Sequence, residues 1–470
     1  GIAVYDSDPK IYDYSARRFF AGMVPAREFF FKSHRHHQGD SYGTYRFSWA
    51  VWAAVIFERM SGKLVFSENM GKVPYFFIYA RLPDGQTLRD GDTTKTGNMW
   101  VAPLRHMAIA GLYKDPYVKQ VSIFEGANDF ARTAPLKFML FNNPDVKPRL
   151  HSELPLTKYF PEPLGSIIAR TGWQTGPDSS AAIVEMKGAG YQFTNHQHLD
   201  AGAFQIYYKG YLATDAGAYS GLKYGTPFDW SYNKRTIAHN AMLAYDPVET
   251  FARGDNDGGQ RQPNNLREPK TLEALLKKGY RNGSILTHDF GPDKIRPFYS
   301  YLDVDLKLAY KKDKLTGYTR TFCFLNFGNP DRAGALIVLD RMSCAKPETR
   351  KIWLLQSLFK PEVNADTITV TRTDGSNSGK LVDNILLPEK NNIKFEVIGG
   401  PGKENYVFGR NYPIPRHSDL SNGWRTQISP VKAAKTDTFL NVLQIMDAKL
   451  KPLKVEKIST ADLLGVIIND

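Results

Sequence analysis

Apolar residues in the first 140 positions recur in runs long enough for helices. Residues 48–60 are mostly apolar and stop at a Ser-Gly pair, and residues 100–111 repeat the pattern. Runs of this kind, closed by a glycine, are typical of helices that bury one face. Residues 134–141 predict a third, shorter helix, whose proline is tolerated because it falls in the first turn. We therefore expect residues 1–140 to be mainly helical and the proline-containing residues 141–163 to be a surface linker.

From residue 164 onward the pattern changes to short β-rich runs, separated by turns that are rich in glycine and aspartate. Some runs alternate apolar and polar positions, which is the two-residue period of a strand with one buried face. Many short strands of this kind predict an antiparallel β-sandwich. We assign residues 164–362 to a central β-sandwich and residues 363–470 to a smaller C-terminal β-rich domain. The expected strands are 167–170, 181–186, 203–208, 319–326, 334–340, 351–358, 367–371, 393–398, 439–445 and 464–468.

Composition narrows the class of partner. The chain has 470 residues, of which 42% are hydrophobic, and a formal net charge of +13. A balance this basic favours a polyanion, such as nucleic acid, an anionic membrane surface or an acidic polysaccharide. No Lys/Arg run is long enough for a nucleic-acid tail, and no zinc-finger or RNA-recognition pattern is present, so we expect no nucleic-acid binding. No stretch approaches the ~18 apolar residues of a membrane span, so we expect no membrane insertion.

The cysteines and aromatic residues give less information about the class of protein. Cys323 and Cys344 are the only two cysteines, too few for a disulfide scaffold or a cysteine-based zinc site. One disulfide and two buried thiols both remain open. The 25 tyrosines and 7 tryptophans suit a carbohydrate cleft, but packing in strands and cores accounts for most aromatic residues in any protein.

Histidines cluster in the strand-rich half. Residues 195–202 read Asn-His-Gln-His-Leu-Asp-Ala-Gly, which brings His196 and His198 within reach of one site. Asp215 and His239 follow near later strands, and two imidazoles with one carboxylate suit Zn²⁺ without thiolates. Each residue also has an ordinary explanation, because Asp215 stands beside a glycine in a turn sequence and most histidines are surface or hydrogen-bonded core groups.

A second cluster, residues 33–46, combines imidazole, phenol and guanidinium groups just before a helix. Asp40 or Ser41 is a candidate N-cap for that helix. A functional interpretation is a loop that presents Tyr42 and Arg46 to a cleft, and the alternative is a solvated histidine-rich loop.

Residues 195–202, with the Phe-Gln-Ile-Tyr-Tyr-Lys-Gly strand that follows them, resemble the heparinase II/III family of polysaccharide lyases, and heparinase II in particular. The matches lie in the expected order from about residue 30 to about residue 430. Further segments that resemble the family are 38–42 (Gln-Gly-Asp-Ser-Tyr), 81–85 (Arg-Leu-Pro-Asp-Gly), 234–240 (Lys-Arg-Thr-Ile-Ala-His-Asn) and 423–425 (Gly-Trp-Arg).

The resemblance implies roles for five residues. Tyr42 matches the family's catalytic tyrosine and His196 its catalytic histidine. His198, Asp215 and His239 match the three protein ligands of one structural zinc ion. These assignments come from the resemblance, since the spacing of the histidines alone does not establish a metal site.

The resemblance also places four residues around the substrate. Arg46 and Tyr219 match residues that line the sugar cleft, and Asn195 is a candidate partner for the substrate carboxylate. Tyr45 is the alternative to Tyr42 if the register of the match is shifted, and it would otherwise lie beside the substrate.

The implied fold is an α+β multidomain chain, with a partial helical (α/α) toroid followed by the antiparallel β-sandwich and the C-terminal β domain. Family members have roughly twice the helical toroid that residues 1–140 can supply. They also carry an Asn or His upstream of the tyrosine that neutralises the uronate carboxylate, and no position here matches it. We therefore expect a separate or missing N-terminal helical segment, leave a homodimer open, and infer a periplasmic or secreted location from the family.

The implied chemistry is β-elimination from a uronic acid in an acidic polysaccharide. Donors must stabilise the charge that develops at the carboxylate, a base must remove the C5 proton, and an acid must protonate the departing O4. Free tyrosine has a pKa of about 10 and is a better acid than base at neutral pH, and a cationic neighbour favours its phenolate. We expect Tyr42 to act as base, acid or both, and His196 to serve as base for the opposite C5 configuration.

Three competing functions remain at the level of sequence. A lyase of the same family could act on alginate or another acidic glycan, although the +13 charge favours the sulfated heparin and heparan sulfate type. A non-catalytic glycan-binding protein would not need the set of Tyr42, His196 and Asn195. A metal-dependent hydrolase would need an open metal position and a nearby acid–base carboxylate, for which Asp200 is the one close candidate.

Overall fold

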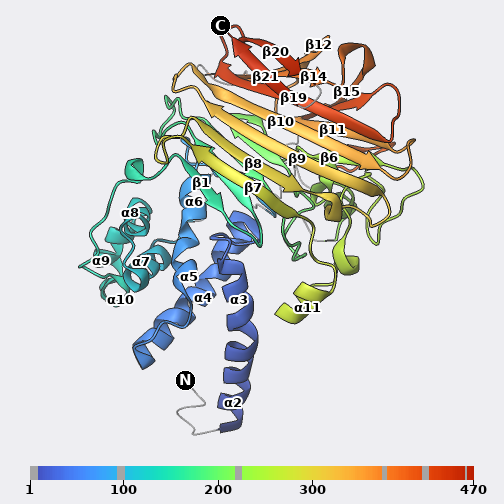
Figure 1. Cartoon of the computed structure of the whole chain (residues 1–470). Helices are drawn as coiled ribbons and strands as arrows, with labels where there is room; N and C mark the ends of the chain where they lie inside the picture. Colours follow the sequence, from blue (N-terminus) through green and yellow to red (C-terminus); the bar gives the residue numbers. More distant parts are fainter. Residues whose placement is uncertain are drawn as a thin grey trace.

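The computed structural model describes residues 9–92, 101–216, 225–372, 378–414, 423–460 and 463–469. A helical part lies below a stack of β-sheets, with the N-terminal helices projecting away from the sheets and the C-terminus at the opposite end (Figure 1). The fold is α+β, as the sequence predicts. The helices are α2 (Pro9–Arg17), which continues through the π-helical η1 (Arg18–Met23) into α3 (Val24–Phe31), then α4 (Gly39–Ser61), α5 (Glu68–Lys72), α6 (Pro74–Ala80), α7 (Pro103–Tyr113), α8 (Pro116–Phe124), α9 (Phe130–Thr133), α10 (Pro135–Phe141) and α11 (Leu272–Lys277).

Each of the three helices expected from the apolar pattern coincides with a helix of the structure: α4, α7 and α10. Helix α4 ends where the sequence predicts, because Gly62 adopts a left-handed conformation (φ 70°) and its N–H bonds back to Glu58 O. Its start differs from the expectation. The N-cap residue is Gln38, so the expected cap at Asp40 or Ser41 is wrong, and Tyr42 lies in the first turns of the helix.

Three antiparallel sheets form the upper part of the molecule. The first is a five-stranded meander of β1 (Thr157–Phe160), β2 (Ser166–Arg170), β3 (Ile183–Lys187), β4 (Phe204–Tyr207) and β5 (Tyr211–Ala213). The second has eight strands in the order β12 (Glu362–Asn364), β13 (Thr367–Thr371), β14 (Gly379–Leu387), β19 (Thr436–Asp447), β10 (Arg332–Cys344), β9 (Leu315–Asn326), β8 (Tyr299–Asp305) and β7 (Ser284–Gly291). The third has four, β15 (Ile393–Gly399), β18 (Trp424–Pro430), β11 (Arg350–Ser357) and β6 (Met242–Tyr245). Two short hairpins are β16 (Tyr406–Val407) with β17 (Arg410–Asn411), and β20 (Lys454–Ser459) with β21 (Leu464–Asn469).

Strand pairing crosses the boundaries expected from the sequence. Strand β1 lies inside the segment 141–163 that we expected to be a linker. Strand β10 pairs with β9 on one side and with β19 on the other, so strands from before and after residue 363 share one sheet. The period of a strand reports which face is buried but not which distant strand becomes its neighbour, and for this reason the sequence could not locate these contacts.

The five-stranded sheet is buried on both faces. Ile167 and Val184 belong to the core between this sheet and the eight-stranded one, whereas Ile168 and Ile183 belong to the core formed with the helices. Double-sided burial explains why β2 and β3 are buried at every position. The loop that follows β3 therefore emerges at the junction of helices and sheets.

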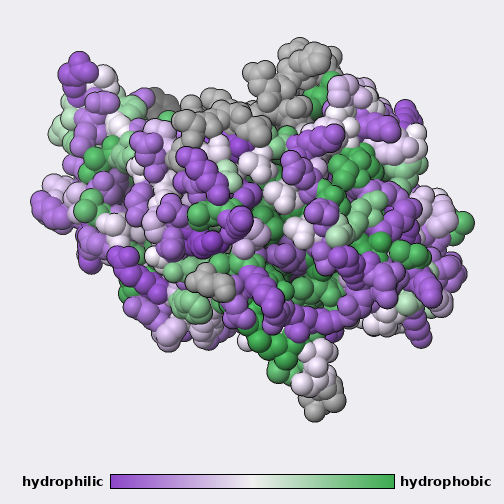
Figure 2. Space-filling model, turned by 90° about the horizontal axis from the view of Figure 1, so that it is seen from above, coloured by the Kyte–Doolittle hydropathy of each residue, from purple (hydrophilic) through white to green (hydrophobic). Residues whose placement is uncertain are grey.

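Several remaining expectations concern the surface and the thiols. Cys323 and Cys344 are both free thiols, the first half-buried and the second buried, so of the two possibilities that the sequence left open the structure has no disulfide. No helix within the described ranges is long and apolar enough to cross a membrane. Seen from above, the surface is largely hydrophilic, with hydrophobic side chains interspersed between charged ones (Figure 2).

The buried Asp383 in β14 makes stability depend on pH. Neither of its carboxyl oxygens has a hydrogen-bond partner among the described residues, and burial raises the pKa of this carboxyl to about 8. An unfolded aspartate has a pKa of about 3.9, so between about pH 4 and pH 8 the unfolded state releases a proton that the folded state keeps. The free energy of unfolding therefore falls as pH rises through this window.

Replacing Asp383 with asparagine is expected to remove that part of the pH dependence. At about pH 9 the free energy of unfolding of the variant should exceed that of the parent by an amount on the order of a few kcal/mol, so the variant should unfold at a higher temperature. At about pH 4 the two proteins should unfold at nearly the same temperature. Thermal unfolding followed by circular dichroism across this range measures the effect. The exposed Asp313→Asn is the control, and equal pH slopes for the parent and Asp383→Asn would contradict the prediction.

Candidate active site

The loop between β3 and β4 carries the histidine pair in a strained conformation. Thr194 and Asn195 both have positive φ, 63° and 59°, a region that a β-branched residue rarely adopts. The side chain of Gln192 holds the loop, because its Nε2 donates to His198 O at 2.6 Å and its Oε1 accepts from Thr194 N at 2.9 Å. The loop thus presents His196 and His198 from a fixed position.

Tyr42 and His196 stack on each other. Their ring centroids are 3.7 Å apart and the rings are within 9° of parallel. Tyr42 comes from α4 and His196 from the β3–β4 loop, so the pair joins the helical part to the sheets. The structure therefore brings together the phenol and the imidazole that the sequence singled out. The alternative tyrosine, Tyr45, is 53% exposed, and its ring packs edge-on against Trp49 with the ring centroids 6.0 Å apart.

Both nitrogens of His196 face charged groups. Nδ1 lies 2.7 Å from Asp92 Oδ2, and Nε2 lies 3.5 Å from an Arg46 guanidinium nitrogen. Arg46 follows Tyr42 by one helical turn, so both side chains reach the same imidazole. A carboxylate at Nδ1 favours the tautomer with its proton on that nitrogen, which leaves Nε2 as the basic atom.

Asp92 is a residue that the sequence did not identify. Its side chain is fully buried, and one carboxylate oxygen faces His196 while the other accepts from His198 Nε2 at 3.0 Å. Lys234 Nζ lies 3.3 Å away. Burial alone would raise the pKa of Asp92, but the hydrogen bonds of both imidazoles and the charge of Lys234 hold it well below its usual range. Asp92 follows Arg-Asp-Gly, which reads as an ordinary turn.

Because Gly91 has no side chain, the segment that carries Asp92 can lie close to the loop that carries His196. Its φ is +55°, and a Cβ at this position would lie 2.6 Å from His196 O. The backbone N–H of Asp92 donates to the same oxygen at 3.1 Å. A side chain at residue 91 would therefore push apart the two segments that hold Asp92 and His196.

Gly91→Ala is expected to reduce any activity of this site by more than tenfold and to lower the unfolding temperature, because the strained φ and the contact with His196 O each cost about 1–3 kcal/mol. Activity assays and thermal unfolding measure the two effects. Gly317→Ala is a suitable control, because nothing lies within 4 Å of a Cβ there. A Gly91→Ala protein indistinguishable from the control would contradict this assignment.

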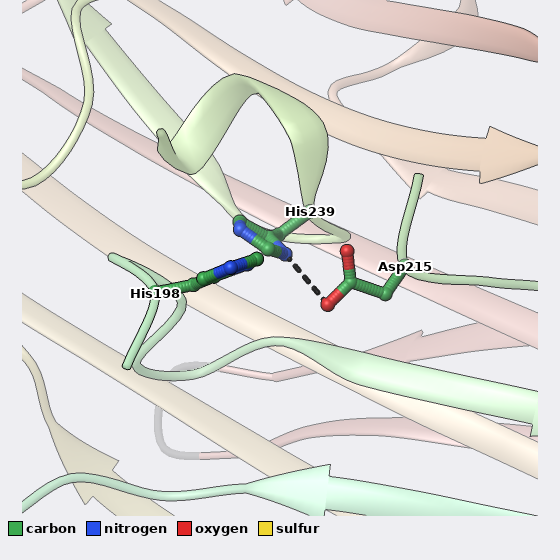
Figure 3. Close-up of side chains that lie close together, drawn as sticks. All are labelled: His198, Asp215 and His239. Atoms are coloured by element: carbon green, nitrogen blue, oxygen red, sulfur yellow. Dashed lines mark ion pairs between the residues drawn. The ribbon is translucent and has the colours of Figure 1, made fainter. Parts of the chain in front are cut away.

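His198, Asp215 and His239 converge from three segments, the β3–β4 loop, the end of β5 and the residue after η5 (Thr236–Ala238) (Figure 3). All three are buried, and one ligand atom from each lies within 4.8 Å of the others. His239 Nδ1 lies 3.0 Å from Asp215 Oδ2. Among the described residues, His198 Nδ1 and His239 Nε2 have no hydrogen-bond partner, although buried ring nitrogens normally have one. The donor set and the unsatisfied nitrogens fit a zinc ion.

The carboxylate of Asp200 forms an ion pair with Lys187. Its Oδ2 lies 2.5 Å from Lys187 Nζ, and the same ammonium contacts Asp90 at 2.9 Å. This buried ion-pair network extends through Asp90 to Arg35, at 2.7 Å, and ties the segment before α4 to the sheet. A carboxylate held in this way is not available as the acid–base group of a metal-dependent hydrolase.

A pocket of about 720 Å³ adjoins the Tyr42–His196 pair. Two of the residues expected to contact the substrate, Arg46 and Asn195, line it, whereas Tyr45 does not. A smaller pocket of about 240 Å³, which contains Trp230 and Arg253, shares Asn195 with the first. Tyr219, the remaining residue expected in the cleft, lies outside the described residues.

Solved structures provide the comparison for this fold. The heparan sulfate lyase HepC from Pedobacter heparinus matches over 92% of this chain with a TM-score of 0.58 and 15% identity in a mutant form. A protein described as a heparinase III gene product matches with a TM-score of 0.57 and 13% identity. The chain spans 57% of the length of each of these proteins. No family model and no curated protein matches the sequence. The similarity establishes that this chain has the fold of those lyases.

Proposed function

We propose that this protein is a polysaccharide lyase that cleaves uronic-acid-containing glycosaminoglycans of the heparin and heparan sulfate type by β-elimination. The observation that carries the proposal is the stacked pair of Tyr42 and His196 beside a cationic pocket, on the fold of heparan sulfate lyases. The motif resemblance to heparinase II in particular supports the same reaction class.

In the proposed reaction, Tyr42 or His196 takes the C5 proton of the bound uronate. The C–H electron pair becomes the C4=C5 double bond, the C4–O4 bond breaks, and O4 leaves with a proton from the tyrosine. No water is consumed. His196 Nε2, oriented by Asp92 on the other nitrogen, is the base for one C5 configuration and Tyr42 for the other. Asp92 acts as a positioning residue, because it reaches the substrate only through the imidazole.

Zinc held by His198, Asp215 and His239 would fix the loop that carries His196. His198 would bind the ion through Nδ1, its atom without a partner, while Nε2–H donates to Asp92. This arrangement of carboxylate, histidine and metal is common around zinc sites, and here the carboxylate is shared with His196. The ion would be structural and need not touch the sugar.

A lyase specific for alginate or another acidic glycan is the second candidate. The four cationic side chains around the large pocket favour a sulfated substrate, because sulfate adds charge that Arg and Lys bind. A purely glycan-binding protein is the third candidate. The buried carboxylate behind His196 argues against it, because binding alone has no use for an oriented imidazole.

The experiment that separates these candidates is ultraviolet absorbance of the unsaturated uronate, measured with heparin, heparan sulfate, chondroitin sulfate and alginate. We expect product from heparin or heparan sulfate. Product from alginate alone would establish the second candidate, and binding without product from any glycan would establish the third. Because such substrates lie outside the cytoplasm, we propose a periplasmic or secreted location.

A further inference from the structure

The large pocket beside the Tyr42–His196 pair is lined by apolar side chains and by a group of cationic ones. Its charged side chains are three arginines, one lysine and a single carboxylate, which belongs to the exposed Glu268. The arginines are Arg18, Arg27 and Arg46. This excess of positive charge faces the space next to the basic nitrogen of His196.

Arg27 and Arg46 are the two half-buried guanidinium groups of this pocket, and both contact imidazoles rather than carboxylates. Arg27 lies 3.3 Å from His36 Nε2, and Arg46 lies 3.5 Å from His196 Nε2. Neither forms an ion pair with any described residue. Burial and the nearby charge of Arg46 lower the pKa of Arg27, which indicates that the two cations repel each other.

Buried arginines elsewhere in this protein have partners for their donors. Arg35, Arg235 and Arg320 each form an ion pair with a carboxylate, and Arg105 and Arg170 donate to backbone carbonyl oxygens. Two guanidinium groups that line one pocket without such partners raise the energy of the folded protein unless an anion binds beside them. The two guanidinium groups are therefore suited to binding an oxyanion.

We propose that Arg27 and Arg46 together bind the carboxylate of the uronic acid that is cleaved. The carboxylate carbon is bonded to C5, and the C5 proton must reach Tyr42 or His196, so the carboxylate must lie within a few ångströms of the base. Arg46 meets this requirement through its contact with His196 Nε2, and Arg27 supplies a second charge from α3. This inference rests on the proposed lyase function and assigns the neutralisation of the carboxylate to residues of this chain.

The chemistry explains why two arginines suit this position. Removal of the C5 proton spreads negative charge onto the carboxylate oxygens, and fixed cations aimed at those oxygens stabilise the transition state more than the ground state. A guanidinium binds a carboxylate through two parallel hydrogen bonds, which also orients the sugar.

Binding of heparan sulfate oligosaccharides to the full chain carrying Tyr42→Phe tests the proposal, because that change is expected to slow turnover about 10²–10⁴-fold. Adding Arg27→Gln is expected to weaken binding about tenfold for native and for desulfated oligosaccharides. For carboxyl-reduced oligosaccharides, which lack the uronate charge, the same change should have an effect of less than about twofold. Isothermal titration calorimetry at one fixed salt concentration provides the values.

Arg18→Gln is the matched control, because it removes one charge from an exposed residue lining the same pocket. If Arg27→Gln weakens binding no more than this control, or if its effect persists on carboxyl-reduced glycans and disappears on desulfated ones, the carboxylate assignment is overturned. If native glycan binds and Arg27→Gln does not change its affinity, this inference is wrong but the proposed lyase function is unaffected. If the parent protein neither binds glycan nor forms unsaturated product, both the inference and the proposed function are wrong.

Discussion

Tyr42→Phe is expected to lower the rate of unsaturated-uronate formation by about 10²–10⁴-fold, the usual range for removal of a general acid or base. The change deletes only the phenol oxygen and leaves the ring that stacks on His196 at 3.7 Å. The variant should therefore fold and bind glycan like the parent, and the loss should be in kcat rather than in KM. Initial rates on heparan sulfate, with KM determined for each protein, measure the effect.

Tyr12→Phe is the control for this prediction. Tyr12 lies on α2 and is 55% exposed, so the same atom is removed far from the imidazole. His196→Ala should produce a loss as large as Tyr42→Phe on at least one of the two C5 epimers of the uronate. Near-parental rates in Tyr42→Phe on every substrate would exclude the phenol from the chemistry.

Asp215→Ala is expected to abolish zinc binding and to lower the unfolding temperature by several degrees. It removes one of three ligands, and an ion present at about 100–1,000 times its dissociation constant contributes about 3–4 kcal/mol to stability. Activity should fall as well, because the loop of His198 also carries His196. Metal content by mass spectrometry and thermal unfolding with and without a chelator give readouts independent of catalysis.

Glu125→Ala separates loss of metal from loss of stability. The Glu125 side chain is fully buried and pairs with His106 in the helical part, so its removal should also lower the unfolding temperature, but zinc content should stay at that of the parent. A parent protein that contains no zinc when freshly purified, and whose unfolding temperature does not respond to the chelator, would refute the zinc assignment.

The sequence predicted those features that depend on local patterns. The Ser-Gly end of α4 and the strands β9, β10 and β11 follow from periodicity and turn residues, and the structure confirms them. The meeting of Tyr42 with His196 was anticipated because both residues belong to motifs, not because their separation of 154 positions could be interpreted. Their catalytic roles and the zinc assignment remain predictions.

The residues that the sequence missed act through tertiary contacts. Asp92 stands in a turn-like sequence, and only the fold shows its carboxylate between two imidazoles. Arg27 lies on an otherwise unremarkable helix, and its lack of a carboxylate partner is visible only once the pocket is formed. The assembly of β10 with β19 across the expected domain boundary is likewise a choice among distant strands. Local pattern carries no information about such pairings.

The masses of the fragments released from a defined heparan sulfate oligosaccharide are the most direct test of the reaction itself. If the phenol and imidazole carry out elimination, the two fragment masses add up to that of the parent oligosaccharide, and one fragment has an unsaturated end. Fragments that together exceed the parent by one water molecule would mean hydrolysis, and the lyase proposal would then be contradicted.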